Sequence, residues 1–238
     1  MLDNLALPRF DVPAAARALG ALLRDPDDLP QVFTLIDSIS GTAPHRLLRA
    51  FRRTESGARL LRDRPDIVTI LGDRPRLRAM PEGSVGRAYL AFVESEGISA
   101  EGIQMASEGR VEPRGGDLRY LMQRMRDTHD LWHPVTGYKG DVLGELSLLA
   151  FTLAQNWHMG IALIVGAAFF KGFGRIETHV IRDGYRRGRS AAWLPAQEWE
   201  SLLPLPLDEV RARLEVGPPP VYTPVRTSEL RAEGVIGA

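Results

Sequence analysis

A long uncharged stretch constrains the fold of this chain more than any other feature of its sequence. From Leu146 to Phe170 there is no Asp, Glu, Lys or Arg over 25 residues. Such a length would allow a membrane span. However, the polar run Gln155–His158 lies at its centre and Gly160 follows, and polar side chains at mid-depth in a bilayer are costly. The pattern therefore favours two buried helices, apolar on all sides and joined by a bend, over a spanning helix.

The composition is that of a globular protein. The chain has 238 residues, of which 44% are hydrophobic and 25% charged, and this suits one large domain with a sizeable core. Its formal net charge is zero, so no general electrostatic attraction to nucleic acid is expected. Cysteine is absent, which excludes disulfides, thiolate nucleophiles and cysteine-ligated metal sites.

Helical patterns dominate the sequence, and no run of alternating β-branched residues indicates a strand. Helices are expected at residues 13–23, 31–39, 45–53, 54–62, 67–71, 83–94 and 117–130, and from about residue 140 into the uncharged stretch. We therefore expect an all-α fold, a single-domain helical bundle over residues 1–216 with a central apolar helix pair. Residues 217–238 are rich in proline and are expected to form a partly mobile tail.

Two histidines near the end of one expected helix form the strongest chemical motif. His129 and His133 are four residues apart and so share a helix face, which lets two imidazole nitrogens reach one ion at roughly 2.0–2.1 Å. Asp130 lies about 100° around the helix from His129, and its short side chain can still lean toward an ion at the helix edge.

The residues after these histidines predict that the chain turns back. Pro134 is expected to end the helix because it cannot donate a backbone hydrogen bond, and two glycines then permit a reversal. Asp141 can cap the next helix, so that Glu145 faces the histidines. The sequence thus predicts a metal-binding helix hairpin with two nitrogen and two carboxylate ligands, a set that suits Fe(II), Mn or Co and is acceptable to Zn.

A structural explanation of the same residues is the alternative. Two histidines at this spacing also occur by chance. A carboxylate such as Glu145 beside a buried helix needs compensation, and Arg126 could supply it in place of a metal ion. His45, His158 and His179 are weaker ligand candidates because each stands alone. A His-Asp phosphohydrolase would need a further well-placed upstream histidine, and His45 is the only one available.

These residues resemble a known family. The pattern His129-Asp130-x-x-His133, followed after eleven residues by Glu145, is similar to the signature of the coenzyme Q biosynthesis protein 4 family, whose Leu-Gly-Glu triplet is present at residues 143–145. The segments MPEGSVGRAY (80–89) and DLRYLMQRMR (117–126) also resemble that family. The similarity covers roughly residues 60–200, whereas the first 40 or so residues and the proline-rich tail match poorly.

The resemblance implies an all-helical protein of ubiquinone biosynthesis. It implies that one divalent metal ion is bound by His129, Asp130, His133 and Glu145, with zinc as the usual assignment in the family and Fe(II) or another divalent ion as the alternative. The implied activity is of the carboxy-lyase type, an oxidative decarboxylation that replaces the C1 carboxyl of 4-hydroxy-3-methoxy-5-polyprenylbenzoate by a hydroxyl. The alternative is a non-catalytic scaffold that binds polyprenyl lipid and organises a ubiquinone biosynthetic complex.

The expected partners follow from this resemblance. They are a polyprenylated benzoate or quinone lipid, a membrane surface, other ubiquinone-biosynthesis proteins and, as an open alternative, a second copy of the chain in a homodimer. The uncharged stretch begins one residue after Glu145, so it could line a groove for a polyprenyl tail as well as form core. Because the sequence begins without a signal-peptide pattern, we expect a cytoplasmic location, peripheral on the inner face of the membrane.

Overall fold

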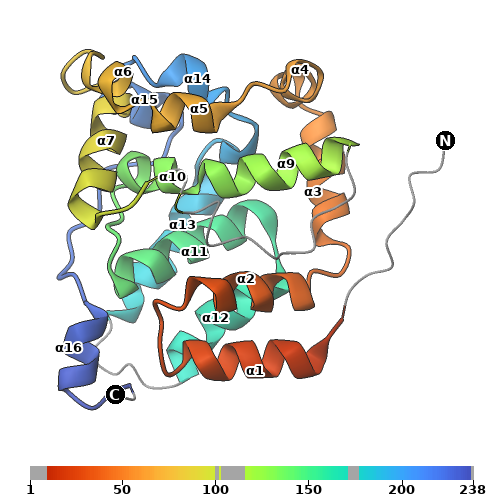
Figure 1. Ribbon diagram of the computed structural model, residues 1–238, viewed down its shortest axis with the longest axis vertical. Helices are drawn as coiled ribbons and strands as arrows, with labels where there is room; N and C mark the ends of the chain where they lie inside the picture. Colours follow the sequence, from red (N-terminus) through yellow and green to blue (C-terminus); the bar gives the residue numbers. More distant parts are fainter. Residues whose placement is uncertain (1–9, 100–101, 103–115, 171–176, 237–238) are drawn as a thin grey trace.

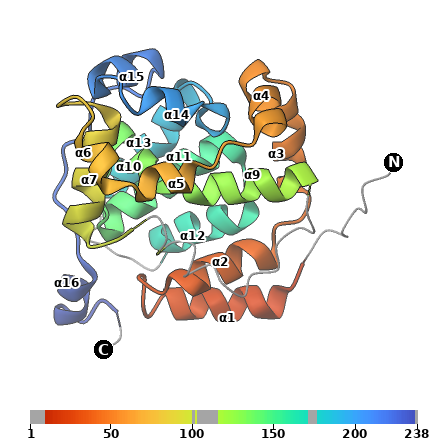
Figure 2. The ribbon, with the colours of Figure 1, turned by 45° about the horizontal axis from the view of Figure 1, so that its top comes forward.

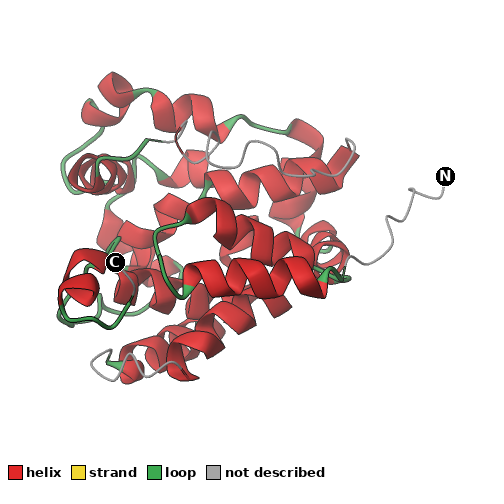
Figure 3. Cartoon of the chain, turned by 60° about the horizontal axis from the view of Figure 1, so that its bottom comes forward, coloured by secondary structure: helices red, strands yellow, loops and turns green. Residues whose placement is uncertain are grey.

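The computed structural model describes residues 10–99, 102, 116–170 and 177–236, and in these residues it consists of helices joined by loops, with no strand (Figure 3). The α-helices are α1 (Val12–Leu22), α2 (Leu29–Ser38), α3 (Ala43–Arg52), α4 (Glu55–Asp63), α5 (Ile67–Gly72), α6 (Arg74–Arg78), α7 (Val85–Glu96), α9 (Gly116–Asp127), α10 (His129–Thr136), α11 (Val142–Asn156), α12 (Met159–Phe170), α13 (Thr178–Ser190), α14 (Trp199–Leu202), α15 (Leu207–Arg213) and α16 (Thr227–Ala232). One short 3-10 helix, η1 (Leu194–Ala196), precedes α14. The expected all-α fold is confirmed.

The uncharged stretch forms the central helix pair α11 and α12. Helix α11 runs through the middle of the molecule, with α9 and α10 on one side and α2 and α12 on the other (Figure 1). The pair is interrupted at Trp157, which has a positive φ of 22°, a conformation that no helix continues. At Gly160 a Cβ atom would lie 2.7 Å from the Cα atom of Ile36, so glycine is needed where α2 crosses the start of α12. Within the described part of the chain, no helix has both the length and the apolar character needed to cross a membrane.

Helices α11 and α13 pack against each other more closely than ordinary side chains allow. Gly184 and Gly188 of α13 face the backbone of α11, where a Cβ atom on either glycine would collide with the carbonyl oxygen of Ser147 or Phe151. The side chain of Gln155 donates a hydrogen bond to the Gly188 carbonyl at 2.5 Å. Small residues therefore let α13 lie directly on the helix that carries Glu145.

The N-terminal helices form a separate layer on α12. Helices α1 and α2 lie side by side as an antiparallel pair beneath α12 (Figure 2). Their small core contains Ala18, Leu22 and Leu35, and Ile164 of α12 packs against it. The opposite side of α12 is covered less completely, since Met159, Leu163 and Phe169 are exposed. One face of α12 thus belongs to the interior and another to the surface.

Candidate metal centre

The two histidines come from a short helix that begins at a kink. Thr128 separates α9 from α10, and its hydroxyl donates a hydrogen bond of 2.8 Å to the carbonyl of Arg124 one turn earlier. His129 and Asp130 form the first turn of α10, and their imidazole and carboxylate lie beside the imidazole of His133.

The predicted effect of Pro134 is wrong. Pro134 lies inside α10, which continues to Thr136 and ends at Gly137 with a φ of 85°. The proline removes only the hydrogen bond that its own nitrogen would have donated one turn back, and the carbonyl of Pro134 accepts a 2.8 Å hydrogen bond from Arg211. The turn toward α11 therefore depends on the left-handed glycine, whose N–H donates to the His133 carbonyl at 2.7 Å.

The His133 ring is fully buried and has a fixed orientation. Its Nδ1 atom lies 3.1 Å from the carbonyl oxygen of Tyr138. A carbonyl can only accept, so Nδ1 carries the hydrogen and Nε2 keeps its lone pair when the ring is neutral. The ring stacks on Phe92 at a centroid distance of 4.6 Å. This is the usual way in which a protein holds a histidine that ligates a metal through Nε2.

Glu145 reaches both histidines from α11. Asp141 caps this helix by accepting hydrogen bonds from the N–H groups of Leu143 and Gly144 at 3.1 and 3.2 Å. The Glu145 carboxylate then lies 3.1 Å from Nε2 of His133 and 3.5 Å from Nε2 of His129. The predicted capping by Asp141 and the convergence of Glu145 on the imidazoles are therefore both present.

The charged groups shift one another's protonation. Burial alone would raise the pKa of Glu145, but the neighbouring histidines outweigh it and hold this pKa well below its ordinary value. Burial alone would lower the pKa of His133, but the carboxylates of Glu145 and Asp130 raise it above 6.5. Asp130 is 8% exposed, and its burial raises its pKa. The Glu145 side chain is 43% exposed and forms part of the wall of a cavity.

The residues present fit a divalent cation. His129, Asp130 and His133 offer ligand atoms that all lie within 4.8 Å of one another, a separation that one shared ion can span. Nε2 of His133 is buried and makes no hydrogen bond of good geometry, although the Glu145 carboxylate lies 3.1 Å away as an ion-pair partner. An unsatisfied buried nitrogen is costly unless something binds it. The cluster could therefore hold a metal ion.

The C-terminal tail contacts the turn that joins the two ligand-bearing helices. The hydroxyl of Tyr222 donates to Asp141 at 2.9 Å and accepts a hydrogen bond from the Lys139 N–H at 2.8 Å. Asp141 also accepts from the N–H of Val225 at 2.9 Å. The tail includes α16. The boundary at residue 216 and the partial mobility of the residues beyond it remain predictions. We name residues 217–225 the tail strap.

Sequence reasoning missed Tyr138, Phe92 and Tyr222 as parts of the site. Tyr138 acts through its carbonyl, and Phe92 and Tyr222 reach the hairpin from distant parts of the chain, so no local spacing marks them. Of the weaker ligand candidates, His158 is buried at the cavity, and His179 is 57% exposed beside Glu177.

A large apolar cavity adjoins the candidate centre. Its volume is about 700 Å³, and His129, Asp130 and Glu145 form part of its wall. Most of the remaining wall is apolar, with side chains from α1, α2, α3, α9, α11 and α12. Such a size and lining are typical of sites for small molecules or lipids. The ionisable side chains of the candidate centre therefore lie in one part of a cavity wall that is otherwise mainly apolar.

Comparison with known proteins gives a consistent result. A family model described as "Coenzyme Q (ubiquinone) biosynthesis protein Coq4" matches residues 10–220, so the similarity extends further toward the N-terminus than the motifs indicated. A ubiquinone biosynthesis protein coq4 from Talaromyces stipitatus is 33% identical over 188 residues, which cover 76% of this chain and 63% of the relative. The corresponding protein of Pyricularia oryzae is 31% identical over 197 residues, which cover 77% and 61%. The chain thus spans less than two thirds of the length of these relatives.

A solved structure shares the fold. The crystal structure of a protein from Nostoc punctiforme that is named for ubiquinone biosynthesis superposes with a TM-score of 0.64 at 23% sequence identity, and covers 88% of this chain and 100% of that chain. At this identity the likeness concerns the fold alone.

The expected location is contradicted by the relatives. The proteins from Talaromyces stipitatus, Pyricularia oryzae and Aspergillus fumigatus are all named as mitochondrial, so the expectation of a cytoplasmic protein, peripheral on the inner face of the membrane, is wrong. That expectation relied on the first residues of the given sequence. The stability of the fold is not tied to one compartment, so these residues were a weak basis for it.

Proposed function

Because the chain belongs to the coenzyme Q (ubiquinone) biosynthesis protein Coq4 family, we propose that it acts on a polyprenylated 4-hydroxybenzoate that is bound beside a metal ion. The observation that supports this most directly is the position of His129, Asp130 and Glu145 in the wall of the apolar cavity, beside the buried His133. A ring with polar substituents would lie at the cluster and its polyprenyl tail in the cavity.

Four side chains would hold the metal ion. Nitrogen ligands would come from His129 and His133, and oxygen ligands from Asp130 and Glu145. When bound, the ion would supply a Lewis acid that stabilises negative charge on substrate oxygens, and Fe(II) in place of zinc would add redox chemistry. The chain itself fixes the tautomer of His133 through the Tyr138 carbonyl and surrounds the space beside the cluster with mainly apolar side chains.

The reaction proposed is the replacement of the ring carboxyl at C1 by a hydroxyl. The bond from C1 to the carboxyl carbon breaks, this carbon leaves as CO2, and a bond from C1 to oxygen forms. The ring loses two electrons in this exchange, and dioxygen is the oxidant that accepts them. One benzoic acid, one dioxygen and one water thus give one phenol, one CO2 and one hydrogen peroxide.

The substrate class also suggests where lipid would reach the chain. A polyprenylated lipid resides in a bilayer, and Trp157, Met159 and Leu163 expose apolar surface at the start of α12. Arg46 of α3 donates a 2.7 Å hydrogen bond to the Trp157 carbonyl, which places a basic group beside this surface. Basic and apolar groups together favour contact with a lipid surface.

Turnover by purified protein tests the proposal. Protein purified without a histidine tag would be loaded separately with Zn, Fe(II), Mn or Co and given a short-chain substrate, 4-hydroxy-3-methoxy-5-geranylbenzoate labelled with ¹³C in its carboxyl, under dioxygen. We expect labelled CO2 and the ring hydroxylated at C1, and neither product from a His133→Ala variant. Lipid binding without turnover under every metal would refute the enzymatic proposal and favour the scaffold.

A further inference from the structure

The helix pair α1 and α2 forms one side of the cavity but has a small core of its own. The cavity wall includes six apolar side chains of this pair: Leu19, Leu22, Leu29, Val32, Phe33 and Ile36. The pair is held together by a buried cluster that is separate from the main core: Ala15, Ala18, Leu22, Leu35 and Ile39. Ile164 of α12 packs against both clusters. A unit that keeps its own core can move while the rest of the fold stays intact.

The chain leaves this pair through a turn that is suited to act as a hinge. Helix α2 ends at Ser38 and α3 begins at Ala43. Between them Gly41 has a positive φ of 51°, which glycine adopts without strain. Hinges are a few loop residues that absorb a change in φ and ψ. The close contact of Ile36 with Gly160 lies within one turn of this end of α2, so it stays near the axis of a rotation about residues 39–42.

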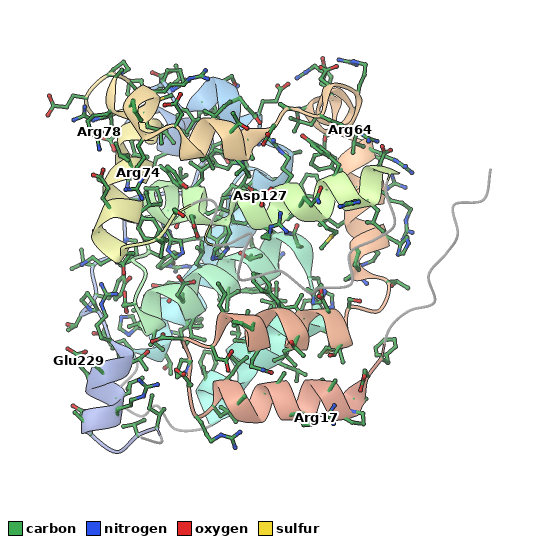
Figure 4. All side chains as sticks on the ribbon, viewed as in Figure 1. Arg17, Arg64, Arg74, Arg78, Asp127 and Glu229 are labelled. Carbon is green, nitrogen blue, oxygen red and sulfur yellow. The ribbon has the colours of Figure 1, made fainter. Side chains whose placement is uncertain are left out.

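The opposite end of the pair is tied to the C-terminal helix α16. The Thr227 hydroxyl donates a 2.8 Å hydrogen bond to the Asp27 carboxylate, and Nη2 of Arg231 lies 3.0 Å from the Asp25 carboxylate. In Figure 4, α16 carries the labelled Glu229 and lies beside the turn that joins α1 to α2. The Arg231 and Asp25 side chains are 43% and 45% exposed, and exposed ion pairs stabilise little. These contacts are therefore weak enough to break and form again.

Helix α16 is itself fixed to the main body of the protein. Arg226, the residue before it, lies 2.7 Å from the Glu96 carboxylate and donates a 3.4 Å hydrogen bond to the Gly140 carbonyl. The tail strap, which comes just before Arg226, is bonded to Asp141. The start of α16 is thus held on the turn between α10 and α11, and its side chains reach from there to the α1–α2 pair.

We propose that the α1–α2 pair is a movable cover of the cavity, which opens about residues 39–42 to admit and release an apolar lipid, and that α16 is the latch that holds it closed. The inference rests on the proposed function for its ligand and describes how that ligand reaches the site. The candidate metal ligands lie on α10 and α11, so the cover opens without displacing them.

A reversible cross-link tests the cover, because the chain contains no cysteine. Asp27→Cys combined with Thr227→Cys would be joined by a short bis-methanethiosulfonate reagent, which a reducing agent removes. Binding of cis-parinaric acid, a fluorescent apolar acid, would be followed by stopped-flow fluorescence. We expect the cross-link to lower the association and dissociation rate constants together, each by at least about tenfold, and to leave the dissociation constant within about twofold, because a gate changes the path and not the bound state. Reduction should restore the rates.

Matched variants on α13 provide the control. Asp183 and Arg186 form an exposed 3.2 Å ion pair there, so the same cross-link between Asp183→Cys and Arg186→Cys should leave both rate constants unchanged. Arg231→Gln weakens the latch and should raise both rate constants roughly twofold to fivefold, whereas Arg186→Gln should not. Unchanged rates in the cross-linked cover, or equal slowing in the cross-linked control, would overturn the inference.

Hydrogen exchange separates this inference from the proposed function. In the free protein, the amides of α1 and α2 should exchange together and faster than those of α11, and faster still in Arg231→Gln. Protection of α1 and α2 equal to that of α11 would overturn the movement of the cover, whatever the ligand. If the parent bound no parinaric acid, the proposed lipid site would fail, and hydrogen exchange would still decide whether the cover moves.

Discussion

Replacing Gly188 by alanine tests the close packing of α13 on α11, the helix that carries Glu145. A Cβ atom at this position would lie 2.5 Å from the carbonyl oxygen of Phe151 and 3.0 Å from the Cβ atom of Ala154. The first distance is about 0.9 Å shorter than the 3.4 Å at which ordinary contact begins. A backbone carbonyl cannot rotate away as a side-chain end can, so the two helices must separate.

The expected cost follows from this overlap. Overpacking of a well-packed interface costs roughly 1–3 kcal/mol, and the better helix propensity of alanine returns up to about 1 kcal/mol. We therefore expect a net loss of about 1–2 kcal/mol in the free energy of unfolding and, for a chain of this size, a Tm lower by roughly 2–8 °C.

Thermal unfolding followed by circular dichroism measures the effect, with Gly20→Ala as the matched control. Gly20 lies in α1, and a Cβ atom added there would meet no neighbouring atom within 4 Å, so alanine at this position should raise stability by roughly 0.5–1 kcal/mol through helix propensity. A Gly188→Ala protein as stable as Gly20→Ala would show that α13 does not approach the α11 backbone as described.

Further predictions concern the hairpin and its protonation. In metal-free protein the raised pKa of His133 contributes stability that is present below about pH 6.5 and lost as the pH rises through the folded pKa, whereas the depressed pKa of Glu145 contributes stability that is present above about pH 4.5 and lost at lower pH. The Tm measured against pH should therefore be highest between these two pH values. A metal-free protein that is most stable at pH 8 would contradict this. Metal affinity should instead increase with pH, because neutral imidazoles bind the ion. Asp141→Ala removes the cap of α11 and leaves buried donors unpaired, so urea unfolding should show a loss of about 2–3 kcal/mol, and a loss below about 0.5 kcal/mol would refute the capping role. Tyr222→Phe should weaken zinc binding in a chelator competition while helix content is kept, because the tail strap then no longer fixes the turn; unchanged affinity would show that the tail strap has no part in the site.

Local patterns predicted much of this fold and of its centre. The i, i+4 spacing of His129 and His133, the capping role of Asp141 and the break after Gln155 are encoded within a few residues, and helix periodicity converts such patterns directly into geometry. Glu145 could be placed for the same reason, because its distance along α11 from the cap is fixed.

Long-range contacts could not be predicted in this way. Tyr222 reaches Asp141 across 81 residues of sequence, and Gly188 matters only because α11 lies against it. Neither contact leaves a repeat or spacing in the chain. The prediction at Pro134 was wrong because a proline removes only one backbone donor, and α10 continues past it until the left-handed Gly137 ends the helix.

Elemental analysis of protein purified without a histidine tag tests the central claim most directly. The parent chain should contain about one divalent metal ion per molecule, since His129, Asp130 and His133 offer ligand atoms within 4.8 Å of one another and Glu145 faces both imidazoles. His133→Ala should lose this ion while circular dichroism shows its helix content retained. A His133→Ala protein that keeps its full complement of metal would contradict the assignment of the centre to these residues.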